Sequence, residues 1–130
     1  MAKGHRTQIK RKRNEENRDL RPQAHVKFAR VSDTKARIVL EQIKGKDVDT
    51  ALAILEYSPR YAASVIAKAL KSAIANAVNN PPHMEHSKLY VEEVIANQGP
   101  TMKRIQPRAR GMAYRINKKT SHISVILNQR

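Results

Sequence analysis

One segment of this chain, residues 97–120, cannot form an ordinary packed loop. Residues 97–120 contain seven Lys and Arg, no Asp or Glu, and no set of apolar side chains large enough for a core. A structureless loop of this length is uncommon inside a compact domain. Apolar, β-rich segments flank it at residues 89–95 and 122–128. We therefore predict that two antiparallel strands continue past the core as a protruding β-hairpin, with roughly ten residues and about 30 Å in each arm.

The predicted hairpin is marginal in water by itself, so something outside the protein must hold it. Its charge indicates phosphate as that partner. Pro107 and Gly111 suit the distal turn, and Pro100 must face away from the strand pairing. Arg108 and Arg110 offer planar groups that bind phosphate in a bidentate manner, unlike the point charge of a lysine. A flexible basic loop without function is the alternative.

The charge of the whole chain supports a polyanionic partner. Its 130 residues, enough for one domain, carry 26 Lys and Arg against 11 Asp and Glu, a formal net charge of +15. The net charge is +5 over residues 1–23, +2 over 24–93 and +8 over 94–130. Aromatic residues are 4% of the chain, too few for extensive stacking on single strands, which favours phosphates and folded nucleic acid. The chain has no Cys, which excludes disulfides, thiolate metal sites and cysteine nucleophiles.

Residues 1–23 form a basic extension with little to fold around. Ile9 and Leu20 are its sizeable apolar residues, so we expect disorder when the protein is free. Four consecutive basic residues at 10–13 favour a nucleic-acid-binding arm over a tail that only aids solubility. The segment has no apolar core of a secretory signal, and no apolar run in the chain is long enough to span a bilayer.

The near-neutral middle of the chain predicts a strand followed by three helices. Over residues 24–31, Val26 and Phe28 alternate with polar residues, which indicates a short strand. Ser32 is a suitable N-cap for a first helix, and Gly45 can close that helix in the left-handed conformation. Asp47 is expected to cap a second helix. Ser58 is expected to cap a third, which has Pro at its first position and ends near residue 79.

The inward positions of the third helix follow a helical repeat. They are expected at Ile66, Leu70, Ala73, Ile74, Ala77 and Val78. Near the end of the chain, Ile123, Val125 and Leu127 alternate with mostly polar residues, which predicts the last strand.

The sequence contains only weak candidates for a catalytic or metal-binding site. His83 and His86 follow two prolines and have no third ligand at a recognisable spacing, so loop histidines are favoured over a metal site. Glu92 and Glu93 are adjacent on a predicted strand and should point to opposite faces, which does not suit a carboxylate pair. We therefore expect no enzyme, no cofactor and no metal. A free architectural DNA-binding protein with a basic β-ribbon arm remains the alternative function.

Two motifs carry a resemblance to a known family. Residues 99–111, GPTMKRIQPRARG, and residues 120–123, TSHI, resemble the signature of the ribosomal protein L-twenty-two family. Residues 29–30, 35–37, 43–46 and 72–77 are similar too, so that the resemblance covers about residues 24–129. It implies an α+β domain over 24–130, with three helices packed on a three-stranded antiparallel sheet and one long hairpin.

The resemblance also implies a function. Family members bind large-subunit ribosomal RNA beside other ribosomal proteins, in the cytoplasm and not on a membrane. Their hairpin lines the exit tunnel of the nascent peptide, near where macrolide antibiotics bind. By position, the tunnel-lining tip comprises Arg108, Ala109, Arg110, Gly111, Met112 and Ala113. The residues expected to contact ribosomal RNA are Lys10, Arg11, Lys12, Arg13, Arg30, Lys35, Arg37, Lys44, Lys46, Lys103, Arg104, Arg108, Arg110, Arg115, Lys118 and Lys119.

Overall fold

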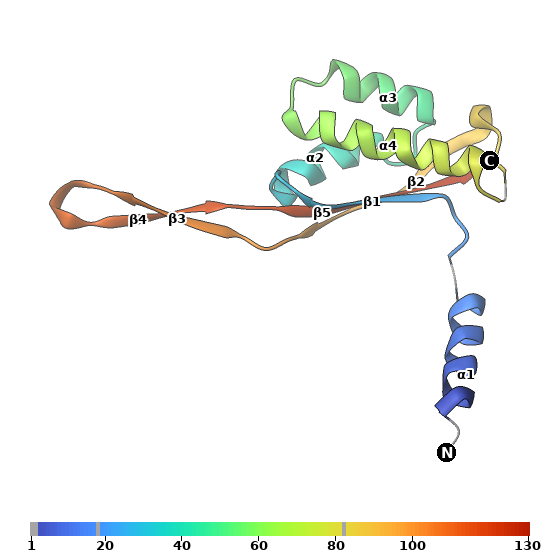
Figure 1. The fold of residues 1–130 in the computed structure, drawn as a ribbon. Helices are drawn as coiled ribbons and strands as arrows, with labels where there is room; N and C mark the ends of the chain where they lie inside the picture. Colours follow the sequence, from blue (N-terminus) through green and yellow to red (C-terminus); the bar gives the residue numbers. More distant parts are fainter. Residues whose placement is uncertain (1–2, 18, 82) are drawn as a thin grey trace.

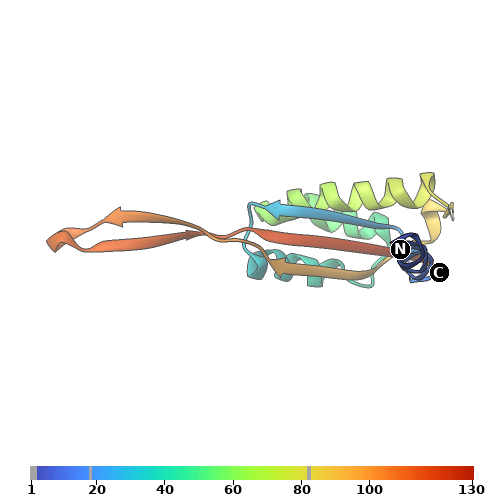
Figure 2. The ribbon, with the colours of Figure 1, turned by 60° about the horizontal axis from the view of Figure 1, so that its bottom comes forward.

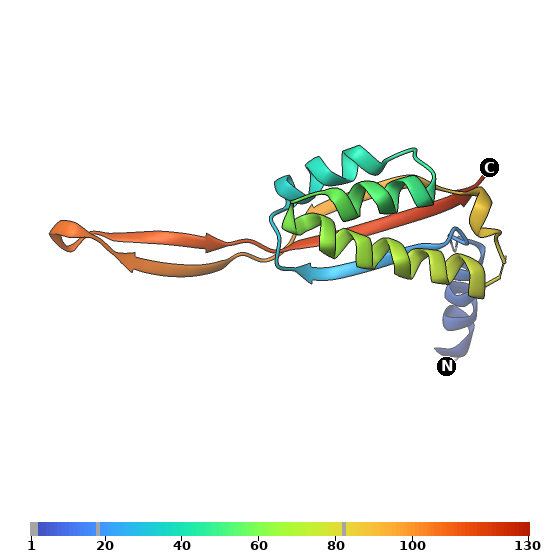
Figure 3. The ribbon, with the colours of Figure 1, turned by 90° about the horizontal axis from the view of Figure 1, so that it is seen from above.

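Three helices lie on one face of a three-stranded antiparallel sheet (Figure 1). The computed structural model describes residues 3–17, 19–81 and 83–130. The central strand of the sheet is the last in sequence, because the order is β1-β5-β2. Seen from above, the helices run over the sheet, whereas its other face carries none of them (Figures 2 and 3). The elements are β1 (Gln23–Ala29), α2 (Asp33–Ile43), α3 (Val48–Tyr57), α4 (Tyr61–Asn79), the short 3-10 helix η1 (His86–Lys88), β2 (Leu89–Gln98) and β5 (Ser121–Gln129).

The core lies between these helices and the sheet. On α4, Ile66, Leu70 and Ala73 are fully buried at helical spacing, as predicted. Val78 was expected to face inward but is 42% exposed, because the buried side of α4 continues through Ala77, and Val78 lies about 100° further around the helix. In β5 the alternate residues are fully buried against the helices, namely Ile123, Val125 and Leu127.

The predicted helix boundaries are confirmed at α2 and displaced at α4. Ser32 caps α2 by accepting a hydrogen bond from the Lys35 backbone N–H, and Gly45 takes a φ of 75° after the helix. The predicted start of α4 after Ser58 is wrong, since Ser58 instead ends α3 in an extended conformation. A residue before proline disfavours helical geometry, and Arg60 is also extended, so α4 begins at residue 61.

The predicted hairpin forms a second, separate sheet. β3 (Met102–Pro107) pairs with β4 (Ala113–Lys118) and extends beyond the helices (Figures 1 and 2). The two arms join the main sheet through a hydrogen bond from the Gly99 N–H to the Thr120 carbonyl, 2.9 Å. Continuous ten-residue arms were expected. Each arm instead has six paired residues, about 20 Å of strand, because pairing is interrupted at residues 99–101.

The distal turn consists of the 3-10 helix η2 (Ala109–Gly111). Arg110 and Gly111 both have positive φ values, 60° and 69°, which reverse the chain tightly. Gly111 is in the turn as predicted. Pro107 instead pairs with Ala113 as the last residue of β3.

A fourth α-helix, α1 (Lys3–Glu16), adds to the three that were expected. It stands away from the sheet at the end opposite the hairpin (Figures 1 and 3). Residues 7–17 are exposed, so no apolar face of this part of α1 is buried in the domain. An isolated helix of this length is marginal in water. We therefore still predict that this segment is disordered in the free protein.

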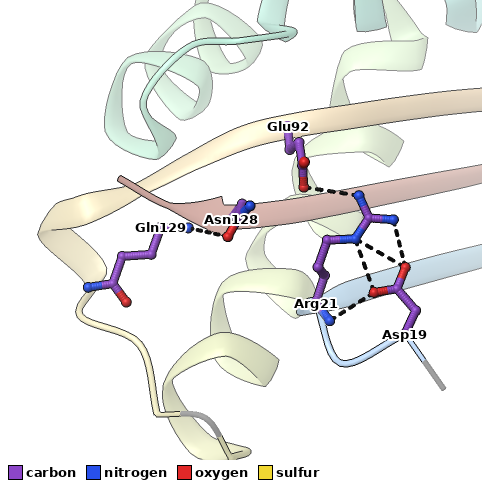
Figure 4. A network of polar contacts seen from close by, with 5 residues as sticks. All are labelled: Asp19, Arg21, Glu92, Asn128 and Gln129. Atoms are coloured by element: carbon purple, nitrogen blue, oxygen red, sulfur yellow. Dashed lines mark hydrogen bonds and ion pairs between the residues drawn. The ribbon is translucent and has the colours of Figure 1, made fainter. Parts of the chain in front are cut away.

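The folded domain begins earlier than residue 24. The Arg21 guanidinium contacts Asp19 at 2.7 Å and Glu92 of β2 at 3.1 Å (Figure 4). The Leu127 N–H donates to the Pro22 carbonyl, 2.9 Å. Hydrogen bonds from Arg21 lower the pKa of Asp19 to about 2. The last residues of the expected basic extension over 1–23 therefore contact β2 and the central strand β5.

Glu92, the partner of Arg21, occupies a β-bulge. Val91 pairs with Leu127 and Glu93 with Ile126, which leaves Glu92 as an extra residue in β2. The strict alternation expected for Glu92 and Glu93 is interrupted at this point.

Candidate nucleic-acid interface

A basic groove lies at the base of the hairpin. It is formed by the link from β1 to α2, the start of α4 and the end of β4. None of the residues that line it is acidic. The lining residues are Arg30, Val31, Ser32, Lys35, Arg60, Tyr61, Ala62, Asn117, Lys118 and Lys119.

Topology brings these distant residues together. The end of β1 and the starts of α2 and α4 all lie at the hairpin end of the sheet (Figure 1). The Arg30 guanidinium also lies 3.4 Å from the Met102 sulfur, a contact between β1's end and the first residue of β3. The N-terminus of α4, which has no acidic residue in its first turn, therefore adds a partial positive charge to that of the five basic side chains.

The groove cations lack internal acidic partners. Within residues 3–17, 19–81 and 83–130, none of Arg30, Lys35, Arg60, Lys118 and Lys119 forms an ion pair. Several basic residues elsewhere are paired, for example Lys71 with Glu56 and Lys88 with Glu85. The positive potential is therefore focused at the groove, where it attracts a polyanion.

The hairpin carries cations on both of its faces. Cross-strand partners share a face, and the partners of Arg104 and Arg115 are Ile116 and Ile105. These two pairs are adjacent in the ladder and point to opposite faces. All residues from 103 to 119 are exposed, including Ile105 at 71%. A ribbon with exposed apolar and cationic side chains on both faces suits a partner that surrounds it.

The tip is held by few contacts of its own. The Arg108 N–H donates to the Met112 carbonyl at 2.8 Å across the turn. The Arg108 guanidinium lies 5.9 Å from the centre of the Tyr114 ring, a cation–π distance. The predicted tip residues, 108–113, are all exposed in the turn and the positions next to it.

The sequence agrees with one family across the domain. The family model described as "Ribosomal protein L22p/L17e" matches residues 24–128. The chain belongs to this family. A relative from Lachnospira eligens named "Large ribosomal subunit protein uL22" is 62% identical over 130 residues, all of both chains. Relatives with the same name are 61% identical over the full length in Lachnoclostridium phytofermentans, and 50% over 107 residues in Clostridium novyi, 82% of this chain and 96% of the relative.

Other predicted contact residues of this L22p/L17e member lie outside the groove. Residues 10–13 are exposed on α1. Arg37 faces the protein itself, because its guanidinium donates to the Ala96 carbonyl at 3.2 Å and lies 3.6 Å from Asp33. Lys44 and Lys46 flank Gly45, whose N–H bonds to Val91 near the start of β2, at the end away from the hairpin. The predicted residues therefore form separate patches.

Arg60 and Tyr61 line the groove but were not among the residues predicted from the sequence. Tyr61 is 69% exposed at the first position of α4, and Arg60 is its N-cap. The basic residue after Ser58-Pro59 was the available signal, but the displaced helix start concealed its position.

The candidate histidines of the L22p/L17e member contact nearby groups. His83 Nδ1 lies 2.9 Å from the Val78 carbonyl, and His86 lies 3.9 Å from Asp49. In the part of the chain that is described, no three His, Cys, Asp or Glu side chains are grouped to hold a metal ion. Among the same residues, no helix has the length and apolarity needed to cross a membrane.

Proposed function

We propose that the chain is a structural component of the large ribosomal subunit in the cytoplasm, where it binds ribosomal RNA and supports subunit assembly. The supporting observation is the acid-free, two-faced cationic hairpin, joined to a groove whose five cations have no described acidic partner. The names of the full-length relatives specify the large ribosomal subunit for those proteins.

The proposed mechanism is scaffolding. Basic side chains that neutralise phosphates release counterions from RNA, which favours binding most at low salt. The helices and the three-stranded sheet hold the groove and the hairpin base at fixed positions, so one protein contacts several RNA segments. Recognition rests on RNA shape and backbone more than on base sequence.

The hairpin is proposed to enter the subunit and line the exit tunnel of the nascent peptide. Its narrow shape and the exposure of every residue from 103 to 119 suit insertion between RNA segments. The tip at residues 108–113 is proposed to face the tunnel, where nascent peptide and macrolide antibiotics come near. Neighbouring large-subunit proteins are the remaining proposed partners.

Sedimentation of the tagged protein in a cell lysate tests the assignment. At moderate salt, the protein is expected to travel with large ribosomal subunits and to leave them only under high-salt stripping. Migration with the nucleoid would support the DNA-binding alternative instead, and migration at the top of the gradient would contradict both.

A tip variant tests the role of the hairpin. Arg108→Ala with Arg110→Ala is expected to weaken binding to a large-subunit RNA transcript and to flatten its salt dependence, because two phosphate contacts are lost. An unchanged salt slope would exclude phosphate contacts at the tip.

A further inference from the structure

A bulge in β1 changes the direction of one aromatic side chain. Val26 pairs with Ile123 and Ala29 with Ser121, so Lys27 and Phe28 both lie opposite His122. The simple alternation in the sequence places Phe28 on the same face as Val26. The extra residue breaks that alternation, and the Phe28 side chain is 60% exposed instead of packing in the core.

The backbone at Phe28 is in an unfavourable conformation. Its φ is 57°, in the left-handed region that bulky side chains rarely adopt. Such strain persists where surrounding contacts maintain it, and it is concentrated at functional sites. A glycine or asparagine would take this conformation at lower cost, so the core gives no reason for an exposed phenylalanine here.

His122 holds Phe28 in two ways. The Phe28 N–H donates to Nδ1 of His122 at 3.0 Å, and the two rings meet at 82° with their centres 4.8 Å apart. In this edge-to-face arrangement, His122 covers at most one face of the Phe28 ring. In a neighbouring cross-strand pair, His25 Nδ1 lies 2.8 Å from Ser124 Oγ, and this contact fixes the orientation of both side chains. The phenylalanine ring is therefore oriented and has an open face.

The surroundings of the ring favour an anionic partner. The hollow beside it is lined by Lys27, His25, His122 and Ser124 among others, and none of its lining residues is acidic. Phe28 and His122 alternate with the buried Ile123 in the pairing of β1 with β5, so they point away from the helices. Figure 2 shows that this face of the sheet carries none of α2, α3 and α4. Two residues beyond Phe28, Arg30 lines the basic groove. A polynucleotide could thus contact both the ring and the groove cations.

We propose that Phe28 stacks on one unpaired base of the bound RNA, while Lys27 contacts an adjacent phosphate. This inference rests on the proposed ribosomal RNA binding and adds a base-stacking site to it. An aromatic ring accepts any base, because each base has a flat π face, so the site reads an unstacked nucleotide and not a sequence. One such contact is compatible with the low aromatic content of the chain.

Affinity for a large-subunit RNA transcript tests the proposal through matched variants. Phe28→Leu removes the ring but keeps an apolar side chain with the same backbone restriction. It is expected to weaken binding by about 5- to 150-fold, the range for loss of one base–aromatic stack. Phe28→Tyr keeps the ring and should bind as the wild type does. Tyr57→Leu is the control, since Tyr57 is 89% exposed at the end of α3 and lines neither the groove nor the hollow beside Phe28.

Two further readouts separate stacking from other effects. Phe28→Leu should lower affinity equally at all salt concentrations, because no charge is lost, whereas Lys27→Ala should reduce the salt slope by about 1. Phe28→Gly should leave the melting temperature of the free protein unchanged or higher, because it relieves the positive φ, yet bind RNA as weakly as the leucine variant. Loss of affinity without loss of stability would support a binding role.

The outcomes distinguish this inference from the proposed function. If the wild type does not bind the transcript in a salt-dependent manner, the proposed RNA binding fails. If the wild type binds and Phe28→Leu binds equally well, only the stacking site is overturned. A photoreactive phenylalanine analogue at position 28 in whole ribosomes gives the second test. A crosslink to RNA supports the proposal, and a crosslink to a neighbouring protein alone overturns it.

Discussion

Removal of two groove cations should change the salt dependence of RNA binding in a calculable way. Arg60 and Lys118 line the groove from different elements, and neither pairs with an acid among the described residues. Each contact with a phosphate contributes roughly 0.7 to 0.9 to the slope of log affinity against log salt. Arg60→Ala with Lys118→Ala should therefore reduce that slope by about 1.4 to 1.8.

The affinity defect of this double variant should depend strongly on salt. Between about 50 mM and about 200 mM salt, the slope change corresponds to a difference of roughly 7- to 12-fold in the defect, which is larger at low salt. Fluorescence anisotropy with a labelled large-subunit RNA transcript, at four salt concentrations, measures both quantities. The melting temperature of the variant should match that of the wild type, because both side chains are exposed.

A matched control separates local contacts from net charge. Lys71→Ala with Lys88→Ala also lowers the formal charge of +15 by two, but these lysines pair with Glu56 and Glu85. Its salt slope is expected to equal that of the wild type. The reasoning is refuted if the groove variant keeps the wild-type slope, or if the control loses as much slope as the groove variant does.

Three further predictions concern stability and ionisation. Ile66→Ala should lower the unfolding free energy by about 2–5 kcal/mol in urea denaturation, because this α4 side chain is fully buried; a loss below 1 kcal/mol would contradict its core role. Asp19 should titrate near pH 2 by NMR, and Arg21→Ala should return its pKa toward 3.8. The pKa is lower in the folded state, so this contact stabilises the fold above about pH 4 and is lost as the pH falls toward 2; an Asp19 pKa that stays low in the variant would exclude Arg21 as the cause. Gly99→Ala should lower the unfolding free energy by about 1–3 kcal/mol, since its Cβ would lie 2.6 Å from the Thr120 hydroxyl; unchanged stability would show that the junction adjusts freely.

Local sequence signals were sufficient to predict a helix start where the capping residue and the apolar spacing indicate the same position. At α2, a serine cap and apolar residues at helical spacing both indicate the same start, and the structure confirms it. At α4, Ser58-Pro59 fits the end of one helix as well as the start of the next, and the link extends to Arg60. The sequence predicted the helix but not its first turn, which is the part that reaches the groove.

The two missed features of the site depend on tertiary structure. Arg60 joins Lys35 and Lys118 because α4 packs over the sheet with its N-terminus at the hairpin end. No local pattern encodes that convergence. The alternation of apolar and polar residues in β1 predicts that Phe28 is a core residue. Only the pairing register with β5 shows the bulge that exposes it.

Folding of the domain and ordering of the hairpin are physically separate events. The buried cluster of apolar side chains comes from β1 to α4 and from β2 and β5, whereas residues 103–119 bury none of their own. A two-stranded ribbon without a core is marginal in water, so its order must be completed by contacts outside the chain. Ile105 and Ile116 remain exposed on it, beside cations that no described acid neutralises. The concentration of basic charge on an element without a core of its own follows from this, because phosphate contacts there must offset the entropy of ordering before they add to affinity.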